Sequence, residues 1–339
     1  MIYCISLFFF IVFLFIGERY KYVRILAFLI PIVLIGLRDN VGTDYLSYNY
    51  IFENIDTNIW IEPGYWILNK LINYAGYDFY VLNTLISIIT FSFIFLRIND
   101  FKEKHLFFWF SLIFILSQSG YSFMVNGVRQ SLAIAVFFYA TRYIESRQLK
   151  RYLLFIIIGA SFHFSILFLV PIYFFSRLRL NFYLYLSIFS LSLIIMSLGI
   201  MDSLYSIILN NLGYEKSTDL GSASMDSSIG FLFMTLIGFI ILSVSKKYIS
   251  NNKDLLLFNC FFLSYIIRFI FLGNMSLFRL YLYFDIIGII YILNLIDYKF
   301  NISHNRLILK GTLFIIYLIF FIKGVTNPNY LLSYKFIDI

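Results

Sequence analysis

Hydrophobic residues in this 339-residue chain gather in long runs that polar stretches separate. Helix is the expected conformation for each run, because lipid offers no hydrogen-bond partners to an open backbone. The runs long enough, or nearly long enough, to cross a bilayer are 2–16, 22–37, 79–96, 106–123, 128–144, 152–175, 181–200, 230–245, 254–273, 276–296 and 307–325. The pattern therefore predicts an all-α polytopic membrane protein.

Two polar stretches, 38–78 and 201–229, are longer than the others. The first contains EPGYWILNKLINYAG (62–76), which predicts a short amphipathic helix lying in the membrane interface. Its apolar face holds Ile67, Leu68, Leu71, Ile72 and Ala75. The second is rich in Gly and Ser and predicts a mobile loop or lid. Nothing indicates an appended soluble module, so we expect one transmembrane domain over 1–339.

Lys and Arg residues indicate which loops face the cytoplasm. They gather after the first run and in the loops 97–105 and 142–151, which places 38–78 and 119–127 on the outer side. The run 152–175 is ambiguous. As one helix of about 36 Å it would cross once and place Arg177 and Arg179 outside.

If 152–175 instead enters and returns, the later cations fall on one side. The outer segments then hold only Lys216 and Lys335. The cytoplasmic loops hold eight cations, namely Arg177, Arg179, Lys246, Lys247, Lys253, Lys299, Arg306 and Lys310. We therefore predict a re-entrant hairpin or two short tilted helices with SFHF (161–164) at the apex, and about ten full crossings. A single straight span remains the alternative.

Four arginines lie at or inside apolar runs, all in the predicted outer half of the membrane. They are Arg38, Arg129, Arg268 and Arg279. An arginine inside a bilayer costs roughly 2.5–3.5 kcal/mol, so it normally faces a cavity or a partner. Acidic residues are scarce in these runs, and we expect the arginines to lie uncompensated and to bind an external phosphate or diphosphate. Interfacial arginines that contact lipid headgroups are the alternative.

Three polar side chains on the predicted outer side are candidates for a general base: Asp44, Glu62 and His163. Each also has an ordinary structural interpretation, such as a helix-capping aspartate or a hydrogen-bonded histidine. No motif for a metal or a nucleotide is present, so we expect no cofactor. The net charge of +8 forms no basic stripe, which argues against nucleic-acid binding.

Several motifs occur in a characteristic order: RDNVGTDYLSYNYIF (38–52), EPGYWILNKLI (62–72), VRQSLAIAVFFYATRYI (128–144), SFHFSILFLVPIYFF (161–175) and FRLYLYFD (278–285). Together they resemble the EpsG family of bacterial polysaccharide-assembly proteins, which includes many Wzy-type O-antigen and capsule polymerases. The R-x-x-VGTD-Y, RQ-x-LA and F-H-x-S elements carry most of this resemblance. It extends over about residues 38–339.

The resemblance implies a metal-independent glycosyltransferase of GT-C-like architecture in the bacterial inner membrane, with its active site facing the periplasm. Its substrates would be repeat units carried on undecaprenyl diphosphate. Membrane lipids would surround it, and a chain-length regulator and a flippase would be its partners. Gln130 and Tyr45 would join the arginines at the substrate, and Asp44 is slightly favoured as the base. A ligase-type transferase and a flippase or carrier remain alternatives.

Overall fold

The computed structural model describes residues 2–57, 60–101, 104–201, 203–204, 228–245, 248–272, 274–300 and 302–326. Within these residues every regular element is a helix. The chain forms two compact units, one of residues 1–173 and 300–339 and the other of residues 174–299. The predicted lid over 201–229 lies almost entirely outside the described residues.

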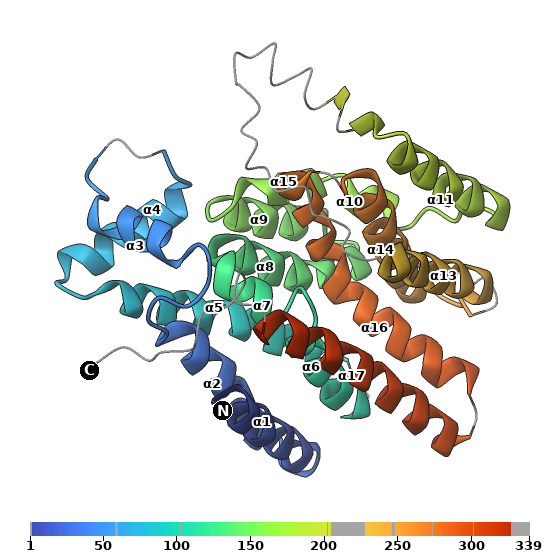
Figure 1. Ribbon diagram of the computed structural model, residues 1–339, viewed down its shortest axis with the longest axis horizontal. Helices are drawn as coiled ribbons and strands as arrows, with labels where there is room; N and C mark the ends of the chain where they lie inside the picture. Colours follow the sequence, from blue (N-terminus) through green and yellow to red (C-terminus); the bar gives the residue numbers. More distant parts are fainter. Residues whose placement is uncertain are drawn as a thin grey trace. The chain divides into compact units, whose positions relative to one another are not determined.

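The first unit contains most of the helices (Figure 1). They are α1 (Ile2–Arg19), α2 (Val23–Gly36), α3 (Tyr45–Glu53), α4 (Pro63–Tyr74), α5 (Phe79–Ile98), α6 (Lys104–Leu116), α7 (Tyr121–Asn126), α8 (Val128–Glu145), α9 (Leu149–Ala160), the 3₁₀ helix η1 (Phe164–Leu169) and α17 (Ser303–Thr326). Helix α8 is the most buried of them and packs against both α5 and α9. The apolar runs thus predicted these helices well.

One predicted span in this unit is wrong. The run 106–123 does not form a single helix, because α6 ends at Leu116 and α7 begins at Tyr121. The chain turns sharply between them, and a Cβ atom at Gly120 would lie 2.0 Å from the carbonyl oxygen of Phe114. The turn falls on the polar stretch SQSG (117–120), where the Ser117 hydroxyl donates to the carbonyl oxygen of Phe114 and lies 3.0 Å from the hydroxyl of Ser119.

The predicted break within 152–175 is confirmed. Helix α9 ends at Ala160, and the chain then continues as η1, which packs against α9. The Tyr152 hydroxyl donates to the carbonyl oxygen of Leu169 at 2.6 Å. A Cβ atom at Gly159 would lie 2.4 Å from the side chain of Ile166. These contacts make a hairpin with Ser161–Phe164 at its apex, and the segment does not form one straight helix.

The second unit contains α11 (Phe182–Ser197), α13 (Ser228–Ser245), α14 (Asn252–Ile270), α15 (Met275–Phe278), the 3₁₀ helix η2 (Arg279–Tyr281) and α16 (Leu282–Lys299). The short helix α10 (Ile172–Phe175) lies at the boundary between the units. Aromatic rings join α14 to its neighbours: Phe258 contacts the ring of Tyr185 at 4.9 Å and that of Tyr291 at 5.6 Å. The run 276–296, predicted as one helix, is divided by η2.

Four helices are long and apolar enough to cross a membrane: Ile2–Arg19, Phe79–Ile98, Arg279–Lys299 and Ser303–Thr326. Further apolar helices of 10–17 residues accompany them in the described part of the chain. The chain is therefore consistent with a polytopic membrane protein. The ten crossings and the GT-C-like architecture stay predictions.

In the first unit, the loops predicted to share a side of the membrane do meet. On the predicted cytoplasmic side, Arg24 donates to Asn99 at 3.3 Å, and Arg97 pairs with Glu145. On the predicted outer side, Arg38 donates to the carbonyl oxygen of Val125 at 3.0 Å. Helix α8 reaches from one group of loops to the other. The pairing agrees with the alternation derived from the charges.

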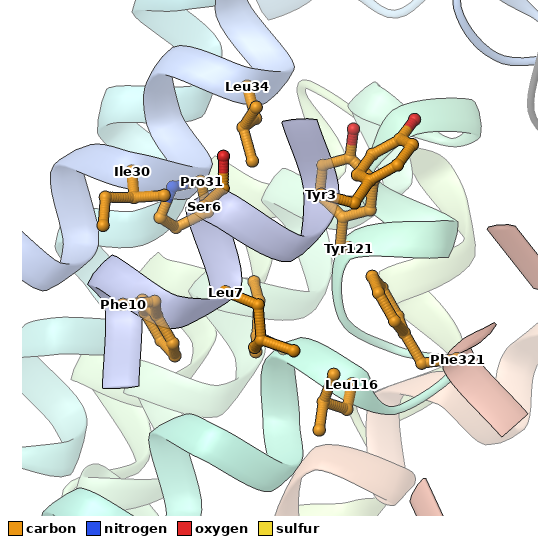
Figure 2. A pocket seen from close by; sticks show the side chains of 11 residues that line it. Tyr3, Ser6, Leu7, Phe10, Ile30, Pro31, Leu34, Leu116, Tyr121 and Phe321 are labelled. Carbon is orange, nitrogen blue, oxygen red and sulfur yellow. The ribbon is translucent and has the colours of Figure 1, made fainter. Parts of the chain in front are cut away.

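A small cavity of about 30 Å³ lies among α1, α2, α6, α7 and α17 (Figure 2). Its lining is almost wholly apolar, and the polar groups at it include Ser6 and the hydroxyls of Tyr3 and Tyr121. The two tyrosine rings lie 5.6 Å apart in an edge-to-face arrangement. None of the predicted site residues lines this cavity, so the candidate site has to be sought elsewhere.

Candidate functional site

The loop RDNVGTDY after α2 folds into a tight turn. Asn40 has a φ of 48° and Gly42 a φ of 98°, conformations that suit Asn and Gly. A Cβ atom at Gly42 would also lie 2.7 Å from the side chain of Val125. The turn is fastened to α7, because the Thr43 backbone N–H donates to Asn126 Oδ1 at 2.7 Å. The glycine in this motif therefore allows the loop to lie against α7.

Arg38 is fully buried at the base of this loop. Its guanidinium donates to three backbone carbonyls, those of Ile35, Val41 and Val125. The ring of Tyr45, itself buried, lies 5.5 Å from its Cζ atom. These hydrogen bonds hold the backbone of the loop in place, which is a structural role for Arg38. A contact between Arg38 and a diphosphate stays a prediction.

Asp44 lies at the N-cap position of α3, where its side chain makes no capping hydrogen bond. Its Oδ1 accepts a hydrogen bond from the Thr43 hydroxyl at 3.0 Å. Gln130 is buried in the first turn of α8. The roles predicted for these two side chains are not decided by their described contacts.

Glu62 brings two other predicted residues together. Its Oε2 pairs with Nη1 of Arg129, and its Oε1 lies 3.1 Å from Nδ1 of His163. The three side chains come from the start of α4, the first turn of α8 and the apex of the α9–η1 hairpin. Glu62 is 8% exposed, Arg129 22% and His163 28%, so the carboxylate is enclosed while the two basic groups remain accessible.

The backbone fixes α4 against the hairpin apex. The N–H groups of Gly64 and Tyr65 both donate to the carbonyl oxygen of Ser161, at 2.7 and 3.2 Å. These are among the N–H groups at a helix start that have no partner within the helix. A Cβ atom at Gly64 would lie 2.4 Å from the Ser161 hydroxyl, so glycine allows this approach. Glu62 is thereby held beside His163.

Two tyrosines surround the Arg129 guanidinium. Its Cζ atom lies 5.5 Å from the ring centroid of Tyr48 and 5.4 Å from that of Tyr65. Such rings attract a cation through their faces. The Nε atom of Arg129 is buried with no hydrogen-bond partner among the described residues. Arg129 is thus oriented by its surroundings while part of its donor set is unused.

The pKa of the Glu62 carboxyl is lowered below its ordinary value. Burial opposes this shift, but the hydrogen bond with His163 and the positive charge of Arg129 outweigh it. Glu62 is therefore ionised at neutral pH. An ionised Glu62 only accepts hydrogen bonds, so Nδ1 of His163 is the donor, and in the neutral imidazole Nε2 then carries the lone pair.

Arg268 and Arg279 belong to the second unit. Arg268 Nη2 pairs with Asp285 Oδ1 at 2.9 Å, and its Cζ lies 4.1 Å from the ring centroid of Tyr281. Arg279 is half-buried in η2. The expectation of uncompensated arginines is therefore wrong for Arg129 and Arg268. A charge in a low-dielectric setting is costly without a partner, and each has found an acid distant in sequence.

The sequence missed some of the contributors. Asn126, whose side chain accepts from Thr43, and the Ser161 carbonyl, which accepts from Gly64 and Tyr65, both hold parts of the site. Every residue has a backbone carbonyl, so the residue types in a sequence do not indicate which carbonyl accepts a hydrogen bond. Among the residues that the structure describes, no group of three or more His, Cys, Asp or Glu side chains lies close enough to hold a metal ion.

Comparison with known proteins confirms the resemblance. The sequence model of the EpsG family matches residues 21–336, nearly the whole chain. No curated protein and no solved structure matches it. Together with its apolar helices, this match makes the chain an integral membrane protein. The chain belongs to the EpsG family, a family of Wzy-like polysaccharide polymerases.

Proposed function

We propose that this protein polymerises lipid-linked oligosaccharide repeat units at the periplasmic face of the bacterial inner membrane. The growing glycan leaves its undecaprenyl diphosphate and joins the non-reducing-end sugar of a newly arrived unit. The observation that carries the proposal is the arrangement around Glu62, which connects an accessible histidine to an accessible arginine. The family supports polysaccharide polymerisation in general.

In this reaction His163 acts as the general base. An acceptor hydroxyl attacks the anomeric carbon of the donor, and its proton passes to Nε2 of His163. A new glycosidic C–O bond forms while the C–O bond to the diphosphate breaks, and the diphosphate keeps the electron pair. Glu62 stabilises the imidazolium that forms, because its carboxylate already contacts Nδ1.

Arg129 is the group proposed to contact the diphosphate. Its guanidinium neutralises charge that builds on the leaving oxygen, and such stabilisation lowers the barrier. A diphosphate held by cations leaves as an anion without a proton donor. The Arg129 side chain is 22% exposed although it pairs with Glu62, which supports this role. Arg38, Arg268, Arg279, Gln130 and Tyr45 stay predicted contributors to substrate binding, and Asp44 stays a candidate base with less geometric support than His163.

The test is a polymerisation assay with purified protein in nanodiscs. The protein receives lipid-diphosphate-linked repeat units extracted from a strain that lacks it, with no nucleotide sugar and no added metal. We expect wild type to produce a ladder of products on a gel, and His163→Ala to produce none. Absence of a ladder from wild type, together with passage of the same lipid across sealed vesicles, would show a carrier. An Arg268→Ala sample in the same gel tests the predicted role of the second unit.

A further inference from the structure

Two aromatic rings stack beside the Glu62–His163 pair and remain open to the surroundings. The ring centroids of Trp60 and Phe164 lie 5.5 Å apart with an interplanar angle of 25°. Trp60 is 84% exposed and Phe164 is 37% exposed. Burial therefore does not account for this pair, since most of the Trp60 surface touches nothing in the described chain. We call it the Trp60–Phe164 platform.

The chain places the platform next to the candidate base. Trp60 precedes Glu62 by two residues, and Phe164 directly follows His163. The backbone hydrogen bonds from Gly64 and Tyr65 to Ser161 hold these two segments together. A ring of a ligand that stacks on the platform would thus lie beside His163. The rings also come preassembled from two distant segments, so little ordering is needed when a ligand binds.

The ligand that fits this position is a sugar ring. A pyranose presents a face of C–H groups with hydroxyls around its edge, and the electron-rich face of an aromatic ring attracts such weakly positive hydrogens. The hydroxyls stay free to reach polar groups nearby. We propose that the Trp60–Phe164 platform binds the non-reducing-end sugar of the acceptor unit and orients its hydroxyl toward His163. This inference rests on the proposed function.

An alternative occupant is the lipid interface, where exposed tryptophans gather. Trp66 on α4 provides the matched control, because it lies on the same outer segment and is 38% exposed. The Lys70 ammonium lies 4.4 Å from the centre of its ring. A purely interfacial role would make Trp60 and Trp66 respond alike. A sugar subsite would separate them.

The kinetic test compares Trp60→Ala, Trp60→Phe, Phe164→Ala and Trp66→Ala in the polymerisation assay. For Trp60→Ala we expect the KM for the lipid-linked acceptor to rise on the order of tenfold. The kcat should change less, because His163 and Glu62 remain. Trp60→Phe keeps a ring and should recover most of the loss, and Trp66→Ala should match wild type. Equal KM values for Trp60→Ala and Trp66→Ala would overturn the proposal.

A binding test does not depend on turnover. The variant with Trp66→Phe and Trp109→Phe leaves Trp60 as the sole tryptophan. Oligosaccharides released by mild acid from the source strain's own polysaccharide should produce a saturable change in its fluorescence, which Phe164→Ala should abolish. No change with the sugars, together with strong quenching by brominated lipids, would assign Trp60 to the interface instead. Sugar binding without any ladder from wild type would overturn the polymerase and keep the subsite.

Discussion

Two arginine–glutamate pairs at the two ends of α8 have the same chemistry and different settings. Near its C-terminal end, Glu145 accepts from Nη2 of Arg97, while Nε and Nη1 of Arg97 bind Thr141 and Asp100. Arg97 is 2% exposed, and each of its guanidinium nitrogens has a partner. Near the N-terminal end, Arg129 pairs with Glu62, is 22% exposed, and leaves Nε without a partner among the described residues.

The difference separates a structural pair from the pair that we propose takes part in the reaction. The Arg97 cluster joins α5 to α8 with its donors already used, so it has little left to offer a ligand. In the Arg129 cluster the carboxylate is shared with His163, and both basic side chains are partly exposed, Arg129 by 22% and His163 by 28%. About 24 Å of helix separates the two ends. Substitutions at the two ends should therefore change different properties of the protein.

The largest effect is expected at His163. His163→Ala should lower kcat by about 10²–10⁴-fold, the usual contribution of a general base. His105 supplies a matched control, because it also contacts a glutamate through Nδ1. The distance is 3.2 Å to Glu18, on the predicted cytoplasmic side, and the His163–Glu62 distance is 3.1 Å. His105→Ala should keep wild-type turnover in the ladder assay. Equal losses in both variants would mean that the loss reports folding and not catalysis.

Arg97→Ala should reduce the free energy of unfolding by about 3–5 kcal/mol, because it leaves Glu145 and Asp100 without their buried partner. Thermal unfolding in detergent measures the loss as a lower midpoint and lower yield of folded protein. Arg142→Ala is the control, since the Arg142 side chain is 37% exposed and its ion pair with Asp100 is long, at 3.6 Å. That change should cost at most about 1 kcal/mol. Similar midpoints for both variants would contradict a structural role for Arg97.

Arg129→Ala should lower kcat about 10²–10³-fold, a typical loss when a donor to a developing anion is removed. Arg129→Lys keeps the charge without the planar fork of donors and should recover only part of the rate. Both variants should be purified as folded protein before turnover is compared. A folded Arg129→Ala variant with the wild-type rate would remove Arg129 from the proposed reaction.

Glu62→Gln should reduce stability at pH 7 by about 1–3 kcal/mol, because it weakens two charge-assisted hydrogen bonds. The folded-state pKa of Glu62 is lowered. Ionised Glu62 therefore stabilises the fold above about pH 4.3, and this contribution disappears as the pH falls through the folded-state value. The midpoint difference between wild type and Glu62→Gln should be constant near neutral pH and shrink below about pH 4. A difference that grew on acidification would contradict the assigned ionisation.

The exposed Glu53 provides the control for that measurement. Its Oε1 accepts a hydrogen bond from Asn49 at 2.7 Å, one turn away on α3. Glu53→Gln should shift the unfolding midpoint little at neutral pH, because exposed pairs within a helix contribute a few tenths of a kcal/mol. A shift as large as that of Glu62→Gln would show that the midpoint responds to any lost carboxylate.

The sequence predicted the helices and the hairpin for physical reasons that act locally. Apolar runs must be helical in lipid, and the cations after residue 175 favoured a return at SFHF over a single straight span. The turn at Gly120 was not predicted, although the stretch SQSG (117–120) interrupts the run with the residue types that favour turns. The amphipathic segment 62–76 was predicted as a helix, and Ile67 and Leu71 on its apolar face are indeed exposed, as an interfacial helix requires.

The site was only partly predictable. Arg129, Glu62 and His163 were each candidates, but nothing in a residue pattern joins positions that lie 67 and 101 residues apart. Glu62 lies in the predicted outer segment and Asp285 in a different apolar run from Arg268, so the sequence does not show which arginine each acid meets. The Ser161 carbonyl that holds α4 could not be foreseen from side chains. Pairing over such separations depends on tertiary packing.

We propose that Glu62 acts on the reaction through His163. A double-mutant cycle in the polymerisation assay tests it most directly, with Glu62→Gln, His163→Gln and the double variant measured beside wild type. We expect the double variant to lose less rate than the product of the two single losses, because Glu62 can no longer act through the imidazole and keeps only its pairing with Arg129. Rate losses that multiply in the double variant would contradict the account and make the two residues independent.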